Sequence, residues 1–310
     1  MLARLSVCIA TYRRPVLLDA LLGDLAVQLR RPQQIVVVDN DAAGSAAEVV
    51  ENWRGRLEGI DVVYAVQPVK NIAITRNRAV ELAQGEWIAF IDDDERAPPS
   101  WLASLEETVV RHAADGVLAP VLAVLPPDAP DWIRHGRFHD RRRMPTGTVV
   151  PSDEMRIGNA LLAAAAVRRL VPVFDPAYGL TGGEDGDMLL RLVQGGARLV
   201  WCDEAAVTEP VPGTRLQMGW ILRRAMRGGQ DHARHFRAGR YGGPPGAARR
   251  LIFFARAAVQ MVVSAGLALL TWPTGRHRGV RWLGRAWANF GKLSVLTGWH
   301  YREYAGPPKP

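Results

Sequence analysis

Short apolar runs alternate with helix-like segments over the first third of the chain. The strand-like runs lie at 5–9, 35–39, 62–66 and 87–92. The helix-like segments lie at 16–30, 45–54, 72–84 and 100–112. Strands that alternate with helices are typical of a mainly parallel sheet that helices cover on both faces. The sequence therefore predicts an α/β fold, and we expect further strands at 117–125, 157–166 and 197–201.

An acidic run follows the fourth strand-like segment. Residues 87–91 are apolar, and Asp92, Asp93, Asp94 and Glu95 come directly after them. Carboxylates in this position present hard oxygen ligands at the C-terminal edge of a sheet, where ligands bind in open α/β folds. Mg²⁺ or Mn²⁺ that bridges to phosphate groups uses such ligands. An acidic, solvated turn is the alternative interpretation.

Four other motifs occur in a characteristic order around this run. They are Thr11-Tyr12-Arg13, Val38-Asp39-Asn40, Ala73-x-x-Arg76-Asn77 and Glu184-Asp185. The series resembles the family 2 glycosyltransferases of GT-A fold, and within that family the bacterial exopolysaccharide enzymes of the succinoglycan-glucosyltransferase type. The resemblance covers the chain from Leu5 to Gln230.

The resemblance implies a nucleotide-sugar site in the first part of the chain. Thr11, Tyr12 and Arg14 would line the nucleotide pocket. Asp39 would accept a hydrogen bond from the imide N–H of uracil; a capping Asx turn after the strand is the alternative. Arg76 would lie near the base or the diphosphate, unless it is an exposed helix arginine.

The resemblance also implies roles for the acidic run. Asp94 would be the direct ligand of a divalent metal, Mg²⁺ or Mn²⁺. Asp92 would contact the donor ribose or the metal's water shell, and Asp93 would orient the same donor-binding turn. Glu209 stands where many relatives have a histidine, so this residue is either a metal ligand or structural.

The downstream motifs would serve the acceptor and the leaving group. By resemblance, Asp185 is the general base, with Glu184 as the alternative, and Asp187 shapes the acceptor site. Capping of a helix N-terminus would explain the same carboxylates without catalysis. Arg215 and Arg227 would clamp the donor diphosphate, because a guanidinium binds phosphate through two parallel donors. A solvated or lipid-facing helix is the alternative for the arginines of this segment.

The last hundred residues are basic and partly apolar. Residues 211–310 contain 17 lysines and arginines but two acidic residues. Apolar runs at 251–272 and 280–298 are interleaved with these cations, which favours anionic lipid over nucleic acid as the partner. We expect a glycosyltransferase domain over 1–239, a Gly/Pro linker over 240–248 and a membrane-associating helical tail over 249–310. A helical subdomain packed on the core is the alternative for the tail.

The two cysteines and the N-terminus bear on location. Cys8 and Cys202 lie in apolar, strand-like contexts, so we interpret both as reduced core residues. The sequence shows no secretory signal, because the apolar run at its start is short and leads directly into Thr-Tyr-Arg-Arg. We therefore expect the enzyme at the cytoplasmic face of a bacterial inner membrane.

These expectations combine into one hypothesis. The chain would be an inverting, metal-dependent glycosyltransferase that uses a UDP-sugar or another nucleoside diphosphate sugar. Its acceptor would be a polyprenyl-diphosphate-linked glycan in exopolysaccharide or envelope synthesis, with anionic lipids as a further partner and no nucleic acid. The alternatives are a nucleotidyltransferase, a silent membrane-bound scaffold and a nucleic-acid-binding protein. A dinucleotide-binding enzyme is not supported, because no Gly-x-Gly-x-x-Gly follows the first strand.

Overall fold

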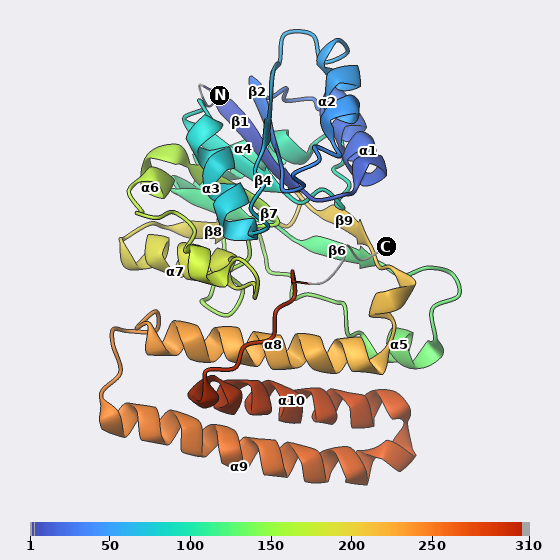
Figure 1. Ribbon diagram of the computed structural model, residues 1–310, viewed down its shortest axis with the longest axis vertical. Coiled ribbons are helices and arrows are strands. Elements are labelled where there is room, and N and C mark those ends of the chain that lie inside the picture. Colours follow the sequence, from blue (N-terminus) through green and yellow to red (C-terminus); the bar gives the residue numbers. More distant parts are fainter. Residues whose placement is uncertain (1, 3, 306–310) are drawn as a thin grey trace. The chain divides into compact units, whose positions relative to one another are not determined.

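In residues 2 and 4–305, the part of the chain that the computed structural model describes, seven strands form one central sheet (Figure 1). Their order across the sheet is β3-β2-β1-β4-β7-β5-β8. The strands are β1 (Leu5–Thr11), β2 (Gln34–Asp39), β3 (Asp61–Val66), β4 (Trp87–Ile91), β5 (Gly116–Leu118), β7 (Asn159–Ala163) and β8 (Leu199–Trp201). The first four are parallel to one another, whereas β7 runs antiparallel to both β4 and β5. The predicted mainly parallel α/β sheet is confirmed.

The register of the parallel strands brings their C-terminal ends together. Thr11 at the end of β1 pairs with Asp39 at the end of β2, and Asp39 pairs with Val66 at the end of β3. Cys8 pairs with Phe90, so the acidic run after β4 emerges at the same edge. All six residues of β2 are buried, as expected of an apolar strand inside a parallel sheet. This edge is therefore where Thr11, Asp39 and the acidic run come together.

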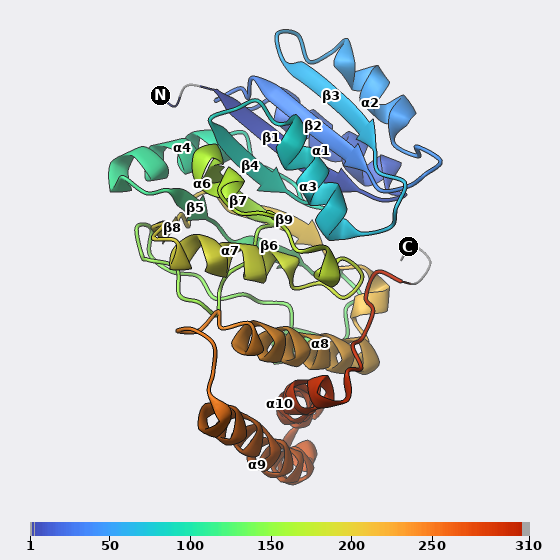
Figure 2. The ribbon, with the colours of Figure 1, turned by 60° about the vertical axis from the view of Figure 1, so that its left-hand side comes forward.

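Helices cover both faces of the sheet (Figures 1 and 2). One face carries α1 (Pro15–Ala26), α2 (Ala47–Arg54) and α4 (Trp101–His112); the other carries α3 (Ile72–Leu82), α6 (Ala164–Arg168) and α7 (Glu184–Gln194). The leucines of α1 point into the core because they recur with helical spacing; they are Leu18, Leu21, Leu22 and Leu25. Cys8 and Cys202 are buried free thiols, as predicted.

The predicted strand at 117–125 is two strands. Pro120 separates β5 from β6 (Val121–Val124), because proline has no N–H to donate and interrupts a ladder. Strand β6 joins β9 (Val207–Pro210) in a separate two-stranded sheet. The segment after β6 contains α5 (Asp131–Gly136), and the predicted strand at 157–166 ends at Ala163, after which α6 begins.

The chain divides into an α/β unit and a helical unit. The described α/β unit comprises residues 2, 4–122, 141–209 and 304–305, and the helical unit comprises 123–140 and 210–303. The helical unit contains α8 (Met218–Arg237), α9 (Ala247–Thr271) and α10 (Arg276–Ser294). The structure thus assigns α8 to the helical unit, whereas the predicted boundary at 239/240 placed it with the glycosyltransferase domain. Residues 306–310 of the predicted tail lie outside the described residues.

Glycines allow the helices of this unit to pack closely. Helix α10 lies between α8 and α9 (Figure 1). A Cβ atom on Gly291 would lie 2.0 Å from the Met226 carbonyl oxygen, and one on Gly229 would lie 1.8 Å from the Ala288 carbonyl oxygen. Both distances are far inside van der Waals contact, so α8 and α10 approach each other at a separation that excludes any side chain at these two positions.

Helix α9 has the composition of a membrane helix. The segment Ala247–Thr274 is long enough to cross a bilayer; its most apolar 18-residue stretch has a mean hydropathy of 1.8, and 17% of that stretch is buried in the protein. Its exposed apolar side chains include Ile252 at 67% and Leu269 at 77%. A core helix of this composition would be covered, so the open face of α9 is a feature that needs a partner.

Candidate active site

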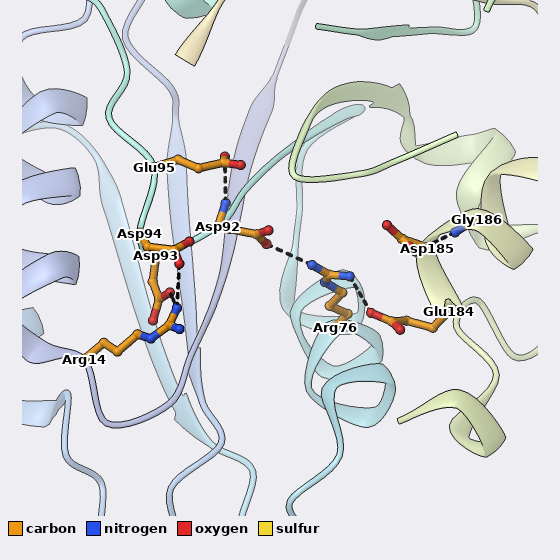
Figure 3. A network of polar contacts seen from close by, with 9 residues as sticks. All are labelled: Arg14, Arg76, Asp92, Asp93, Asp94, Glu95, Glu184, Asp185 and Gly186. Atoms are coloured by element: carbon orange, nitrogen blue, oxygen red, sulfur yellow. Dashed lines mark hydrogen bonds and ion pairs between the residues drawn. The ribbon is translucent and has the colours of Figure 1, made fainter. Parts of the chain in front are cut away.

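The acidic run forms a tight turn at the end of β4 (Figure 3). The Asp92 N–H donates a 3.1 Å hydrogen bond to Glu95 Oε2, and the Glu95 N–H donates a 3.1 Å hydrogen bond to the Asp92 carbonyl oxygen. Glu95 is 2% exposed, and its burial raises the pKa of the carboxyl group well above the ordinary value. Glu95 therefore shapes the turn from inside, a role that the motif did not reveal.

Residues at the end of β1 hold this turn in place. Arg14 Nη1 lies 2.9 Å from Asp93 Oδ1 and 2.9 Å from Asp94 Oδ2. Thr11 Oγ1 donates a 2.8 Å hydrogen bond to Asp93 Oδ2. Burial, and then the neighbouring Asp93 carboxylate, raises the pKa of Asp94 to about 7. The structure brings these four predicted residues together, and the direct contacts of Thr11 and Arg14 are with carboxylates.

Tyr12 forms an aromatic surface beside the same turn. Lys70 Nζ lies 4.4 Å from the centroid of its ring, and the guanidinium carbon of Arg13 lies 5.3 Å from it. Arg13 has a positive φ of 54° and is held by Asp41, with Nε 3.0 Å from Oδ2. A ring flanked by two cations suits a flat, anionic ligand such as a nucleotide. The nucleotide-binding role of Tyr12 remains a prediction.

Arg76 links the acidic turn to the second acidic motif. Its Nη2 lies 2.8 Å from Asp92 Oδ1 and its Nη1 lies 2.6 Å from Glu184 Oε1 (Figure 3). The Arg76 side chain is 12% exposed, so it is not the exposed helix arginine of the alternative interpretation. The guanidinium neutralises two carboxylates that lie 92 residues apart in sequence. It therefore fixes the predicted donor side relative to the predicted acceptor side.

Two asparagines of the same segment extend this link. Asn71 caps the N-terminus of α3 by accepting a hydrogen bond from the Ile74 N–H, and its Nδ2 donates to the Pro176 carbonyl oxygen at 3.1 Å. Asn77 binds both polar groups of the Phe174 backbone at 2.8 Å. Helix α3 thus anchors the loop that precedes α7. The contacts with Pro176 and Phe174 join residues that are 105 and 97 positions apart, so no local sequence pattern predicts them.

The Glu184 motif forms the first turn of α7. Gly183 precedes the helix with φ of 93°, a left-handed conformation that favours glycine. Asp185 is partly exposed, and its Oδ1 accepts a 2.8 Å hydrogen bond from the Gly186 N–H. Asp187 is 1% exposed and its Oδ2 lies 2.8 Å from Arg191 Nε. Asp185 is therefore the accessible aspartate of this turn, whereas Asp187 faces the interior.

Asp39 is fully buried at the end of β2. Its Oδ1 accepts a hydrogen bond from the Asp41 N–H at 2.9 Å, and its Oδ2 accepts from the Ala46 N–H at 2.8 Å. Tyr64 donates its hydroxyl to Oδ2 at 3.1 Å. The Asx-type contact with Asp41 is present, as the alternative interpretation required. Recognition of a nucleotide base by Asp39 remains a prediction.

Glu209 lies close to the acidic turn. Strand β9 is joined to the turn by an antiparallel bridge in which the Arg96 and Thr208 backbones exchange hydrogen bonds of 2.8 and 3.0 Å. The Glu209 carboxylate contributes to raising the pKa of both Asp94 and Glu95. The structure therefore places this predicted residue beside the predicted metal ligand, although 115 residues separate Glu209 from Asp94.

Arg141 is a cation of this site that the sequence did not single out. It is partly buried and makes no hydrogen bond or ion pair with any residue that the structure describes. The carboxylates of Glu209, Glu95 and Asp92 face it, but burial and the neighbouring Arg156 guanidinium lower its pKa. An unpaired guanidinium near an acidic cluster is available to bind an anion. Arg141 belongs to none of the sequence motifs, so no sequence signal marked it.

The acidic residues have the chemistry of a divalent-metal site. Within residues 2 and 4–305, no three His, Cys, Asp or Glu side chains are already arranged around a common point as metal ligands. The carboxylate of Glu209 is nevertheless close enough to Asp94 to help raise the pKa of Asp94. Hard oxygen donors under such repulsion suit Mg²⁺ or Mn²⁺, which commonly takes one or two carboxylates and completes its shell with phosphate oxygens and water. The residues present therefore fit a divalent cation.

The two predicted clamp arginines lie in the helical unit. Arg215 is in a short 3₁₀ turn, with its guanidinium carbon 5.8 Å from the centroid of the Trp220 ring. Arg227 lies in α8 and pairs with Glu303 at 3.8 Å. The neighbouring Gln230 bonds within the unit, to Ser294 Oγ at 2.8 Å. Binding of a diphosphate by Arg215 and Arg227 remains a prediction.

Comparisons with known proteins agree with this geometry. The family model "Glycosyl transferase family 2" matches residues 6–163. The succinoglycan biosynthesis protein ExoM of Rhizobium meliloti (strain 1021) is 35% identical over 295 residues, which are 94% of this chain and 92% of that protein. The validoxylamine A glucosyltransferase of Streptomyces hygroscopicus subsp. limoneus is 35% identical over 123 residues, 39% of this chain and 26% of that protein.

Solved structures share the fold. The mannosyltransferase PcManGT from Pyrobaculum calidifontis, in complex with GDP-Man and Mn²⁺, superposes with a TM-score of 0.63 at 18% identity, over 96% of this chain and 87% of that one. TarS from S. aureus in complex with UDP-GlcNAc superposes with a TM-score of 0.55 at 17% identity, over 97% and 93%. At these identities the likeness concerns the fold.

Proposed function

Because this chain belongs to glycosyltransferase family 2, we propose that it moves a sugar from a nucleoside diphosphate sugar to a lipid-linked glycan during polysaccharide synthesis. Family membership gives the glycosyltransferase activity. The succinoglycan relative supports the exopolysaccharide role, and structural neighbours that bind UDP-GlcNAc or GDP-Man support the donor class. We take UDP as the nucleotide.

The observation that carries this proposal is the double ion pair of Arg76. It holds Glu184, and with it the start of α7, against the acidic turn at the sheet edge. Transfer requires the acceptor hydroxyl and the donor's anomeric carbon to be held in reacting geometry, and a rigid link between two motifs supplies such preorganisation. Arg76 is therefore proposed as a positioning residue between the donor and acceptor sites.

Asp185 is proposed as the general base. It follows Glu184 in the first turn of α7 and is the more accessible of the two, since Glu184 is 2% exposed. The carboxylate takes the proton of the acceptor hydroxyl, and the alkoxide oxygen forms the new bond to the anomeric carbon as the bond to the diphosphate breaks. A single displacement from the face opposite the leaving group inverts the anomeric configuration.

The leaving diphosphate needs positive charge. Asp94, with Glu209 as second candidate, would hold a divalent cation, which when bound supplies Lewis-acid stabilisation of the departing oxygens. The mannosyltransferase that shares the fold binds Mn²⁺, which supports this assignment. Arg141 is the residue of this chain that we expect to contact the same anionic group, because its guanidinium lacks a partner among the described residues.

The helical unit supports a place at the membrane. The exposed apolar face of α9 and the excess of arginine suit the surface of an anionic bilayer. Cationic segments beside an apolar helix remain on the cytoplasmic side, so we place the enzyme at the cytoplasmic face of a bacterial inner membrane. A polyprenyl-diphosphate-linked acceptor would be available there.

Calorimetric titration of UDP into the full-length protein tests the donor site. We expect binding with Mn²⁺, its loss with EDTA, and its loss in Asp94→Asn with Mn²⁺ present. Asp185→Asn should bind UDP like the unchanged protein. Equal binding by Asp94→Asn would refute Asp94 as the metal ligand, and no binding of UDP, GDP or dTDP under any condition would refute the nucleotide-sugar site.

One further variant decides the role of Glu209. If Glu209 is a metal ligand, Glu209→Gln weakens UDP binding with Mn²⁺ and leaves thermal stability unchanged. If it is structural, the melting temperature falls without added metal, and UDP affinity of the folded fraction stays the same. The two readouts separate the alternatives that the sequence left open.

A further inference from the structure

A polar cavity lies among the three long helices of the helical unit. Its volume is about 330 Å³, which is large enough for a phosphate group and its hydration. Helix α9 contributes most of its lining, and α8 and α10 contribute one residue each. The lining residues are His232, Phe253, Arg256, Ala257, Gln260 and Lys292.

The cavity contains like charges without an opposite charge. Arg256 and Lys292 both line it, and no acidic side chain does so in the described part of the chain. Burial and the nearby Arg256 guanidinium lower the pKa of Lys292. Lys292 Nζ donates to Asn289 Oδ1 at 3.0 Å, whereas Arg256 makes no hydrogen bond or ion pair with any described residue. No acidic side chain among the described residues of the cavity lining balances these two positive charges.

The neighbours of Arg256 indicate which kind of anion the cavity would bind. Side chains three and four residues apart on a helix are neighbours, so Arg256 lies between Ile252 and Val259. Both are exposed, at 67% and 63%. A soluble anion gains nothing from such apolar neighbours, whereas a phosphate attached to acyl chains places its charge on the cations and its hydrocarbon beside the open face of α9.

We propose that the cavity lined by Arg256 and Lys292 binds the anionic phosphate headgroup of a membrane lipid. The site fixes the depth and orientation of α9 at the bilayer surface, so the helix lies in the interface and does not merely adhere through its total charge. This inference rests on the membrane association proposed above, and it goes further by assigning a specific headgroup site.

Flotation of the full-length protein with vesicles tests the site. Three compositions are compared: phosphatidylcholine alone, phosphatidylcholine with phosphatidate, and phosphatidylcholine with oleate added to the same surface charge. We expect the unchanged protein to prefer phosphatidate over oleate by about tenfold, since one charge-assisted hydrogen bond contributes at least that factor. The double variant Arg256→Gln/Lys292→Gln should bind both anionic vesicles equally.

A matched variant controls for charge. Arg278→Gln/Arg285→Gln removes two exposed cations of α10 that lie outside the cavity. It should lose affinity for both anionic vesicles in proportion and keep the preference for phosphatidate. An equal loss of preference in both double variants would overturn the site, because ordinary surface electrostatics would then explain the binding.

Two further outcomes are decisive. If soluble pyrophosphate binds the lipid-free protein through Arg256 and Lys292 and removes the preference at a concentration equal to that of the lipid, the site takes a free anion and the lipid assignment is wrong. If the unchanged protein floats with none of the vesicles, the membrane association itself fails. Binding to both anionic vesicles without preference defeats the headgroup site alone.

Discussion

The acidic turn after β4 and the cationic cavity of the helical unit each bring charges of one sign close together. They differ in whether side chains of opposite charge neutralise them. In the turn, Arg14 and Arg76 form ion pairs of 2.8–2.9 Å with the carboxylates. In the cavity, Arg256 and Lys292 have no acidic partner among its lining residues. Removing one partner of a buried ion pair destabilises the fold, because it leaves the other charge uncompensated, whereas a charge without an opposite partner is available to a ligand.

The comparison extends to single residues of the α/β unit. Arg76 is bound on both sides, whereas Arg141 has no partner among the described residues. Glu184 is paired with Arg76, whereas Asp185 accepts a hydrogen bond from its own helix and is partly exposed. We therefore expect paired residues to affect stability when replaced and unpaired ones to affect binding or transfer.

Asp185→Asn is expected to have the largest effect. Removing a general base lowers the rate of transfer by about 10²- to 10⁴-fold, while UDP binding and the melting temperature stay unchanged. Asp187→Asn is the matched control, because it removes a buried carboxylate that is paired with Arg191. The main effect of Asp187→Asn should be a lower melting temperature. Initial rates with a UDP-sugar and thermal unfolding measure both; equal rates for Asp185→Asn and the unchanged protein would require another base.

Arg76→Gln should cost about 3 kcal/mol of unfolding free energy, the lower end for a broken buried pair, because Asp92 is 42% exposed. Arg78→Gln, on the same helix, breaks an exposed pair with Glu81 and should change stability by about 0.5 kcal/mol or less. Arg256→Gln should leave stability unchanged or higher, since it removes a repulsion. Urea unfolding measures the free energy of unfolding of all three variants. A large loss of stability in Arg256→Gln would contradict the expectation that this unpaired cation does not stabilise the fold.

Gly291→Ala tests whether packing, and not charge, holds the helical unit together. The added Cβ would meet the Met226 carbonyl oxygen at 2.0 Å, so α8 and α10 must separate, at a cost of about 1–3 kcal/mol. Gly284→Ala on the same helix meets only the Ala225 Cβ at 4.0 Å. It should stabilise by about 0.5–1 kcal/mol through helix propensity. Chemical unfolding measures the change in unfolding free energy for both variants. If the two changes had the same sign, the close contact would be refuted.

Arg141→Gln should have the smallest effect on the fold. No hydrogen bond with a described residue is lost, so the unfolding free energy should change by about 1 kcal/mol or less. UDP affinity in the presence of Mn²⁺ should fall about tenfold, because a charge-assisted contact with the diphosphate disappears. Arg142→Gln is a neighbouring control with an exposed side chain. A loss of stability without a loss of affinity would assign Arg141 to the fold.

Sequence reasoning located most elements because their signals are local. The β-branched run that became β2 and the leucine spacing of α1 each identify their own element. It failed at 117–125, where Pro120 divides two strands that belong to different sheets. The choice of sheet depends on partners such as β7 and β9, which lie far away in the chain, and no local pattern contains that information.

The candidate site also has features that local sequence patterns predict and features that they do not. Local sequence patterns are enough to place carboxylates at the ends of β2 and β4, at one edge of a parallel sheet, because apolar periodicity and strand–helix alternation are read from neighbouring residues. Three other features appear only in the folded chain: Arg76 bridges Asp92 and Glu184, Glu209 lies close to Asp94, and Arg256 and Lys292 line one cavity from two helices. These contacts join residues that are distant in sequence, and their electrostatic energy depends on separation and burial, which the folded chain alone defines.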